Sequence, residues 1–242
     1  MRICYRIKRE VRPTLPISAL ILLALTLILA ACGGGNTTST TPDAHQLIKN
    51  AQAAFQKVTA YHFNLAADNA GAGGFLVVKS ADGDTLVPDK LRADANAVVL
   101  GNVVKVKIVS IGAKQYVTDP ITGRWTPTSG LIDPRGLSNS QTGVVAVLGQ
   151  IENPSTPTDN SVDGTPCWSI NGKLDAKYLQ GITGGGAPAG TKVNVTTCIG
   201  KSDNLPYLIR INGIAIQGDT DKTVRTFKLS KFNEALTIAA PV

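Results

Sequence analysis

Residues 91–108 read LRADANAVVLGNVVKVKI, and apolar side chains alternate with polar ones along this stretch. A period of two is typical of β-strands that have one dry face and one wet face. Gly101-Asn102 interrupts the alternation and predicts a tight turn between two antiparallel strands. The residues expected on the dry face are Leu91, Ala93, Ala95, Ala97, Val104, Val106 and Ile108.

Alternation of the same kind occurs on both sides of this hairpin, which predicts an antiparallel meander. Asp82-Gly83 is interpreted as the tight turn of a further hairpin. The other expected strands cover residues 61–68, 75–80, 115–118, 123–126, 165–174, 192–199, 205–217 and 223–229. No segment repeats with a period of about 20–50 residues, so the sequence does not indicate a solenoid or a propeller.

Two other segments have helical features. Thr41-Pro42 has the residue types of an N-cap and a first helical proline, and apolar residues then recur at helical spacing as far as Val58. Residues 143–151 (GVVAVLGQI) are apolar nearly all round and are compatible with a buried strand. A short helix inside an apolar concavity fits their length and flanking loops slightly better.

The N-terminus has the pattern of an export signal. Basic residues precede an apolar run at 17–31, which is shorter than the ~20 residues that span a bilayer. Leu29-Ala30-Ala31-Cys32 matches a lipobox, in which the cysteine is acylated and becomes the first residue of the mature protein. An uncleaved membrane helix, or an ordinary signal with a chance cysteine, is the alternative.

This pattern divides the chain into three parts. Residues 1–31 are the signal peptide, which is removed, and residues 32–41 are a flexible linker that begins at the acylated Cys32. Residues 42–242 form a single domain. Much of the formal net charge of +7 lies in the removed segment, and no Lys/Arg run interleaved with aromatic residues indicates nucleic-acid binding.

Cys167 and Cys198 are the two cysteines that remain after export and acylation. In an oxidising compartment they most simply form a disulfide. A catalytic thiol and a metal pair are the rival interpretations. Both lack a partner nearby in sequence, because His45 and His62 lie far upstream.

The sequence has few features of an enzyme. It contains no G-x-S-x-G, no HExxH and no glycine-rich phosphate loop between a strand and a helix. Several aspartates that could serve as a general acid or base stand next to glycine, proline or asparagine, where aspartate commonly forms turns. These aspartates are Asp82, Asp119, Asp133, Asp163, Asp203 and Asp219. His45 and His62 are expected on the surface. We therefore expect no catalytic residues, no metal and no cofactor.

Ala93, Ala95 and Ala97 place three small side chains in succession on the dry face of one strand. A sheet face that packs densely usually has bulkier β-branched or aromatic residues. The alanines therefore either leave room for an apolar ligand or accommodate a helix that packs close against them. The sequence leaves both possibilities open.

Several segments resemble the LppX/LprA/LprF/LprG family of actinobacterial cell-envelope lipoproteins. They include VDGTPCWSINGKLD at 162–175, Leu205-Pro206-Tyr207 and KLSKFN at 228–233, and the resemblance extends from Asp43 to Pro241. It implies an α+β fold in which a strongly curved antiparallel sheet, a half-barrel like that of the LolA/LolB carriers, has a few helices on its concave face. It also implies a hydrophobic cavity for the acyl chains of lipids or glycolipids.

Our leading hypothesis is a non-enzymatic lipoprotein, anchored on the extracytoplasmic side of the cell membrane, that binds lipid or glycolipid for transport or presentation. Its expected partners are the membrane, the lipid ligand and an envelope lipid exporter. A structural or partner-binding lipoprotein with a filled core is the alternative, and an envelope hydrolase is a third. The expected cavity residues are Phe55, Phe63, Leu65, Ala93, Ala95, Val104, Val106, Ile108, Val144, Val145 and Leu148.

Overall fold

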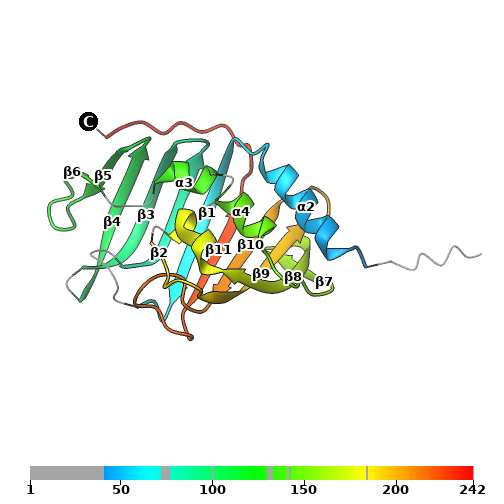
Figure 1. Ribbon diagram of the computed structural model, residues 1–242. Helices are drawn as coiled ribbons and strands as arrows, with labels where there is room; N and C mark the ends of the chain where they lie inside the picture. The colour runs from blue at the N-terminus through cyan, green and yellow to red at the C-terminus, as the bar shows by residue number, and fades with distance from the viewer. Residues whose placement is uncertain are drawn as a thin grey trace, which may run out of the picture. The chain divides into compact units, whose positions relative to one another are not determined.

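The computed structural model describes residues 41–71, 77–99, 101–129, 133–139, 141, 143–183 and 185–241. Eleven strands in these residues form one sheet in the order β6-β5-β4-β3-β2-β1-β11-β10-β9-β8-β7. Every neighbouring pair is antiparallel. The fold is α+β, as predicted, and the sheet curves around helices on its concave side (Figure 1).

Most strands follow the predicted alternation. β7 was not predicted from the sequence, and β10 is shorter than the predicted strand at 205–217. The strands are β1 (Ala60–Asp68), β2 (Val77–Leu86), β3 (Lys90–Val99), β4 (Asn102–Ile111), β5 (Lys114–Thr118), β6 (Trp125–Thr128), β7 (Thr158–Val162), β8 (Thr165–Asp175), β9 (Lys192–Gly200), β10 (Pro206–Asn212) and β11 (Val224–Ser230).

The helices in the described residues are short, and three of them, α3, η2 and α5, were not predicted from the sequence. The predicted apolar segment at 143–151 is helical, which settles the choice between strand and helix. The helices are α2 (Ala44–Phe55), α3 (Pro134–Ser138), α4 (Val144–Gly149), the 3-10 helix η2 (Ala176–Leu179) and α5 (Gln180–Thr183).

Helix α2 begins two residues later than Thr41-Pro42 predicts. Its N-cap is Asp43, whose carboxylate accepts a hydrogen bond from the backbone N–H of Gln46 at 2.8 Å. Aspartate satisfies an unpaired amide of the first turn, so the cap forms at Asp43 and the prediction of Thr41 was wrong.

The Asp82-Gly83 hairpin was also a wrong prediction. Both residues lie inside β2, where Gly83 pairs with Phe63 on one side and with Ala93 on the other. A Cβ at Gly83 would lie 2.3 Å from the carbonyl oxygen of Arg92. The glycine therefore permits a close approach between β2 and β3 and does not turn the chain. Phe75, at the start of the predicted strand, lies outside the described residues.

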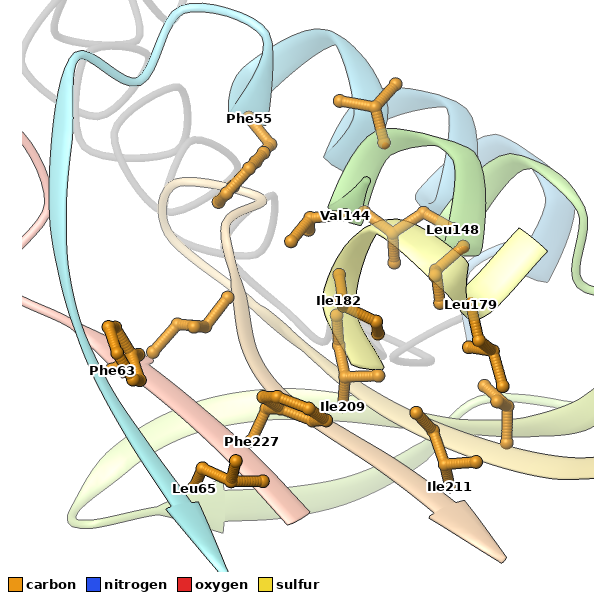
Figure 2. Close-up of a cluster of buried hydrophobic side chains, with 14 of the residues drawn as sticks. Phe55, Phe63, Leu65, Val144, Leu148, Leu179, Ile182, Ile209, Ile211 and Phe227 are labelled. Carbon is orange, nitrogen blue, oxygen red and sulfur yellow. The ribbon is translucent and has the colours of Figure 1, made fainter. Parts of the chain in front are cut away.

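The part of the sheet formed by β8, β9 and β10 is densely packed against helices. Its inward side chains are bulky, and they meet Leu148 of α4 and Leu179 of η2, as the close-up in Figure 2 shows. Ile170, Leu174 and Ile211 are at most 1% exposed. β-Branched and leucine side chains fill this part of the interior, as in an ordinary protein core.

Cys167 and Cys198 form a disulfide between β8 and β9, with a Cα–Cα distance of 5.5 Å. The two sulfurs belong to a small buried cluster with Val162 that is separate from the main core. In β8, Cys167 alternates with core residues such as Ile170 and Leu174, so the disulfide lies on the face of the sheet that points away from the helices.

Residues Thr41–Val242 form one compact unit. The predicted signal peptide, the acylation site at Cys32 and the linker as far as residue 40 lie outside the described residues and stay predictions. Within the described residues, no helix is long and apolar enough to cross a membrane.

Candidate functional site

A cavity of about 830 Å³ lies between the sheet and the helices. Its floor is formed by inward side chains of β1 to β6, β10 and β11, and its roof by Leu137, Val144 and Ile182 of the helices. A single buried water needs only about 10–15 Å³. The cavity is therefore far larger than a packing defect, and it has the size of a small-molecule binding site.

The floor of the cavity is apolar, and its side chains are small in the middle. Ala81 of β2 and Ala93 and Ala95 of β3 line it directly. Around these alanines the wall consists of larger apolar residues, namely Tyr61, Phe63, Leu65, Leu91, Val106, Ile108, Ile209, Phe227 and Leu229. Ala81, Ala93 and Ala95 thus border empty space, whereas Ala97 is fully buried and does not line the cavity.

Seven of the eleven predicted cavity residues lie in this wall: Phe63, Leu65, Ala93, Ala95, Val106, Ile108 and Val144. Six of them are on strands, where a period of two fixes which side chains face inward. The other four, Phe55, Val104, Val145 and Leu148, are not among the lining residues.

Phe55 lies in an aromatic cluster beside the cavity. Its ring centroid is 5.4 Å from that of Tyr61 and 6.4 Å from that of Phe232 in the C-terminal segment. The edge-to-face contact with Phe232 is a favoured aromatic geometry. Phe55 therefore packs the end of α2 against the C-terminal segment, and its neighbour Tyr61, unlike Phe55, lines the cavity.

Helix α4 directs only Val144 into the cavity. Gln52 of α2 donates a hydrogen bond to the carbonyl oxygen of Val145 at 3.1 Å, which fixes that side of α4 against α2. Leu148 is fully buried and points toward Leu179 (Figure 2). Because α4 is apolar all round, its sequence does not show which side faces the cavity. Val104 is only partly buried, near the turn between β3 and β4.

Exposed residues line the cavity in two regions. At the β5–β6 edge its lining includes Pro120, Thr126 and Ser129, which are exposed. Near the β10–β11 connection the lining includes Gln217, which is also exposed, and its backbone N–H donates to the carbonyl oxygen of Gly186 at 3.0 Å. Polar residues such as Thr126, Ser129 and Gln217 therefore line the cavity near the surface, while most of its interior wall is apolar.

One wall residue, Arg225 of β11, is charged and nearly buried. Its side chain is 8% exposed and is paired with Asp219, whose side chain has no exposed surface. Nη2 lies 2.8 Å from Asp219 Oδ1, and Nη1 donates to Oδ2. Asp219 also accepts hydrogen bonds from the backbone amides of Ala215 at 3.1 Å, Ile216 at 3.0 Å and Gly71 at 3.4 Å.

This environment lowers the pKa of Asp219. Burial alone would raise it, but the hydrogen bonds from Arg225 and from the Ile216 amide favour the charged carboxylate and outweigh that effect. From the sequence, Asp219 was predicted to be a turn residue, and its pairing with Arg225 was not predicted. Arg225 does have a sequence signal, because it occupies the same inward phase of the strand as Phe227 and Leu229.

Tyr61 is a second ionisable group in the wall, and Asp119 lines the cavity at its β5–β6 edge. Burial raises its pKa to about 12, so its hydroxyl stays protonated at neutral pH. The interior therefore presents one paired guanidinium and one neutral phenol to whatever occupies it.

The model of the LppX_LprAFG lipoprotein family matches residues 43–238. The chain belongs to this family. LprF of Mycobacterium tuberculosis strain H37Rv, described as a candidate diacylated glycolipid transporter, is 23% identical over 250 residues, which cover 96% of this chain and 95% of LprF.

Two crystal structures have the same fold as this chain. LprF of Mycobacterium bovis superposes with a TM-score of 0.67 at 20% identity, over 83% of this chain and 99% of that one. LppX of M. tuberculosis superposes with a TM-score of 0.60 at 18% identity, over 81% and 98% respectively. The fold predicted from the family resemblance is thereby confirmed.

The face of the sheet that points away from the cavity has a polar cluster around His62. Nδ1 of His62 lies 2.9 Å from Asp84 and Nε2 lies 3.3 Å from Asp82, and Arg92 also binds Asp84. Asn64 donates to Asp82 at 3.3 Å. The cluster lies on the opposite face of the sheet from the cavity, so His62 does not contact the candidate site.

Proposed function

We propose that this lipoprotein holds the acyl chains of a lipid or glycolipid in the cavity between its sheet and helices. The observation that supports this most directly is the apolar, roughly 830 Å³ hollow itself. A protein whose only role was structural would be expected to fill that space with its own side chains. The family membership, and the description of LprF as a candidate glycolipid transporter, support the same function.

The driving force would be the removal of acyl chains from water. Each buried methylene contributes about 0.8 kcal/mol, so a chain of ordinary length binds strongly in a preformed apolar cavity without any specific polar contact. The polar openings would leave the headgroup in water. The role would be carriage or presentation of lipid and not catalysis.

The proposed location is the extracytoplasmic side of the cell membrane, with the protein anchored by acyl groups on Cys32. The lipobox at residues 29–32 supports this proposal. Two or more acyl chains would hold the protein stably at the membrane. An envelope lipid exporter is a proposed partner that would receive or deliver the ligand.

Ala95→Trp tests the proposed function. The indole would enter the cavity from the middle of its floor, so the variant should fold and retain severalfold less lipid. Full-length protein is purified from membranes, its detergent is exchanged for amphipol, and the retained lipid per mole of protein is measured by mass spectrometry.

Asp94→Trp is the matched control, because Asp94 is exposed on the opposite face of the same strand. It adds the same bulk outside the cavity, and its lipid content should equal that of the wild type. Equal lipid content in all three proteins would contradict lipid binding in this cavity.

A further inference from the structure

We propose that Arg225 binds the ester carbonyl oxygens of the lipid, so that the cavity selects acyl esters over chains without a carbonyl. The proposal rests on the proposed lipid-binding function and extends it to the chemical class of the ligand. Arg225 is the one arginine or lysine among the lining residues that the structure describes.

The position of Arg225 in the cavity wall is set by its pairing with the neighbouring strands. Its neighbours across the strands are Ala67 of β1 and Ile211 of β10, which are both buried. A charged side chain that is only 8% exposed is costly unless it is paired, and Asp219 supplies the partner. The buried charge is thus retained in a place where an apolar residue would pack at lower cost.

Among the described residues, Asp219 does not use all the N–H donors of the guanidinium. Arginine has five N–H groups, and the hydrogen bonds of Arg225 to side chains in the described part of the chain all go to Asp219, through Nη1 and Nη2. The carboxylate is meanwhile occupied by backbone amides as well as by Arg225. N–H groups of Arg225 that are not directed at Asp219 therefore remain for an acceptor in the cavity.

The charge balance favours a neutral acceptor. The Arg225–Asp219 pair has no net charge, so an anionic group brought to Arg225 would also meet the nearby carboxylate. A carbonyl oxygen accepts the N–H without adding charge. A hydrogen bond from a charged donor is also stronger than one between neutral groups.

The position of Arg225 along the cavity fits the place where an acyl chain joins its headgroup. Phe227 and Leu229 continue the same face of β11 away from Arg225 as apolar wall. Gln217 and Ile216, close to Asp219 in sequence, line the opening on the other side. A lipid with its chains on Phe227 and its headgroup at Gln217 would place its ester groups near Arg225.

The test is a competition between two lipids that differ only at the linkage. Full-length protein in amphipol is offered an equimolar mixture of dioleoylglycerol and the corresponding dioleyl ether of glycerol. The retained ester-to-ether ratio is then measured by mass spectrometry. We expect the wild type to retain the ester in excess by roughly tenfold, the effect of one hydrogen bond to a charged group.

The decisive variant is Arg225→Met/Asp219→Asn, which removes both charges together and leaves no unpaired buried ion. It should bind both lipids with a ratio near one, and its cooperative thermal unfolding shows whether it folds. Arg210→Met/Asp221→Asn is the matched control, because both of its residues are exposed. It should keep the ratio of the wild type.

A ratio near one for the wild type would overturn the ester proposal while leaving lipid binding intact, and this measurement requires no variant. An unchanged ratio in the Arg225→Met/Asp219→Asn variant would overturn it as well. In a second competition, phosphatidic acid that outcompetes dioleoylglycerol in the wild type would mean that Arg225 selects an anion instead. If neither glycerol lipid is retained, the proposed function fails together with this inference.

Discussion

Asp219 is held in place by a guanidinium and by backbone amides of the connection between β10 and β11. These contacts fix residues 215–219 next to the opening of the cavity, so the pair has a structural effect whether or not Arg225 touches a ligand. Breaking such a pair by removing one partner leaves a buried, uncompensated charge and typically costs about 3–5 kcal/mol. Removal of both partners costs much less stability, because no unpaired charge is left buried. The two residues are therefore replaced together.

The lowered pKa of Asp219 predicts a contribution to stability that depends on pH. The unfolded chain has an ordinary carboxyl pKa, so the contribution is complete above about pH 5 and is lost as the pH falls through the lower, folded-state value. Each pKa unit by which folding lowers the value contributes about 1.4 kcal/mol of stability.

Between pH 6 and about pH 3, denaturant unfolding should show a larger loss of stability in the wild type than in Arg225→Met/Asp219→Asn. The other carboxylates are common to both proteins, so an equal loss would contradict this assignment.

Helix α4 has two kinds of apolar residue, although its sequence does not distinguish them. Val144 borders the cavity, while Leu148 is fully buried against η2. Removing atoms next to an existing hollow costs only their transfer free energy, whereas truncation in a packed region also leaves a new cavity. Substitutions at these two residues of one helix therefore compare the cost of truncation beside the cavity with its cost in the packed core.

Leu148→Ala should destabilise the protein by about 2–5 kcal/mol and leave the lipid content of the folded protein unchanged. Val144→Ala should cost about 1.6 kcal/mol or less, the transfer value of two methylenes, and should weaken lipid binding slightly. Denaturant unfolding and lipid mass spectrometry of both variants provide the comparison. Similar losses of stability in the two variants would contradict the position of Val144 at the cavity.

Alternation along single strands made much of the sheet predictable. It placed Phe63, Ala93 and Ile108 on the inward face because the strand period is a local property. The same local reasoning failed at Asp82-Gly83, where pairing on both sides of β2 overrides the turn preference of the dipeptide. Interactions between distant segments determine such features, and a single strand pattern does not contain them.

The candidate site was predictable to a similar extent. The inward phase of β11 contains Arg225, but only folding brings the connection that holds Asp219 to it. The orientation of α4 was not predictable either, because an all-apolar helix has no hydrophobic face to identify. Six strand residues of the wall were therefore predicted from sequence, whereas others such as Ile209 and Phe227, most of the helix residues and the ion pair were missed.

At the scale of the whole molecule, one continuous sheet has a filled part and a hollow part. β8 and β9 present bulky residues such as Ile170 and Val195 to the helices, whereas β2 and β3 present Ala81, Ala93 and Ala95 to the cavity. The disulfide lies in the filled part, on the outer face. One end of the sheet is thus densely packed against the helices, while the other end borders the cavity.

A hollow of fixed size predicts how affinity changes with acyl-chain length. Each added methylene that enters the cavity contributes about 0.8 kcal/mol, which is roughly fourfold in the dissociation constant. Once the cavity is full, further methylenes remain in water and the affinity should reach a plateau. Competition within a series of diacylglycerols of increasing chain length, with full-length protein in amphipol, measures this dependence.

Ala95→Trp should move the plateau to shorter chains, because the indole occupies part of the same volume, whereas Asp94→Trp should not move it. An affinity that rises without a plateau, or that does not depend on chain length, would mean that the acyl chains lie outside the cavity.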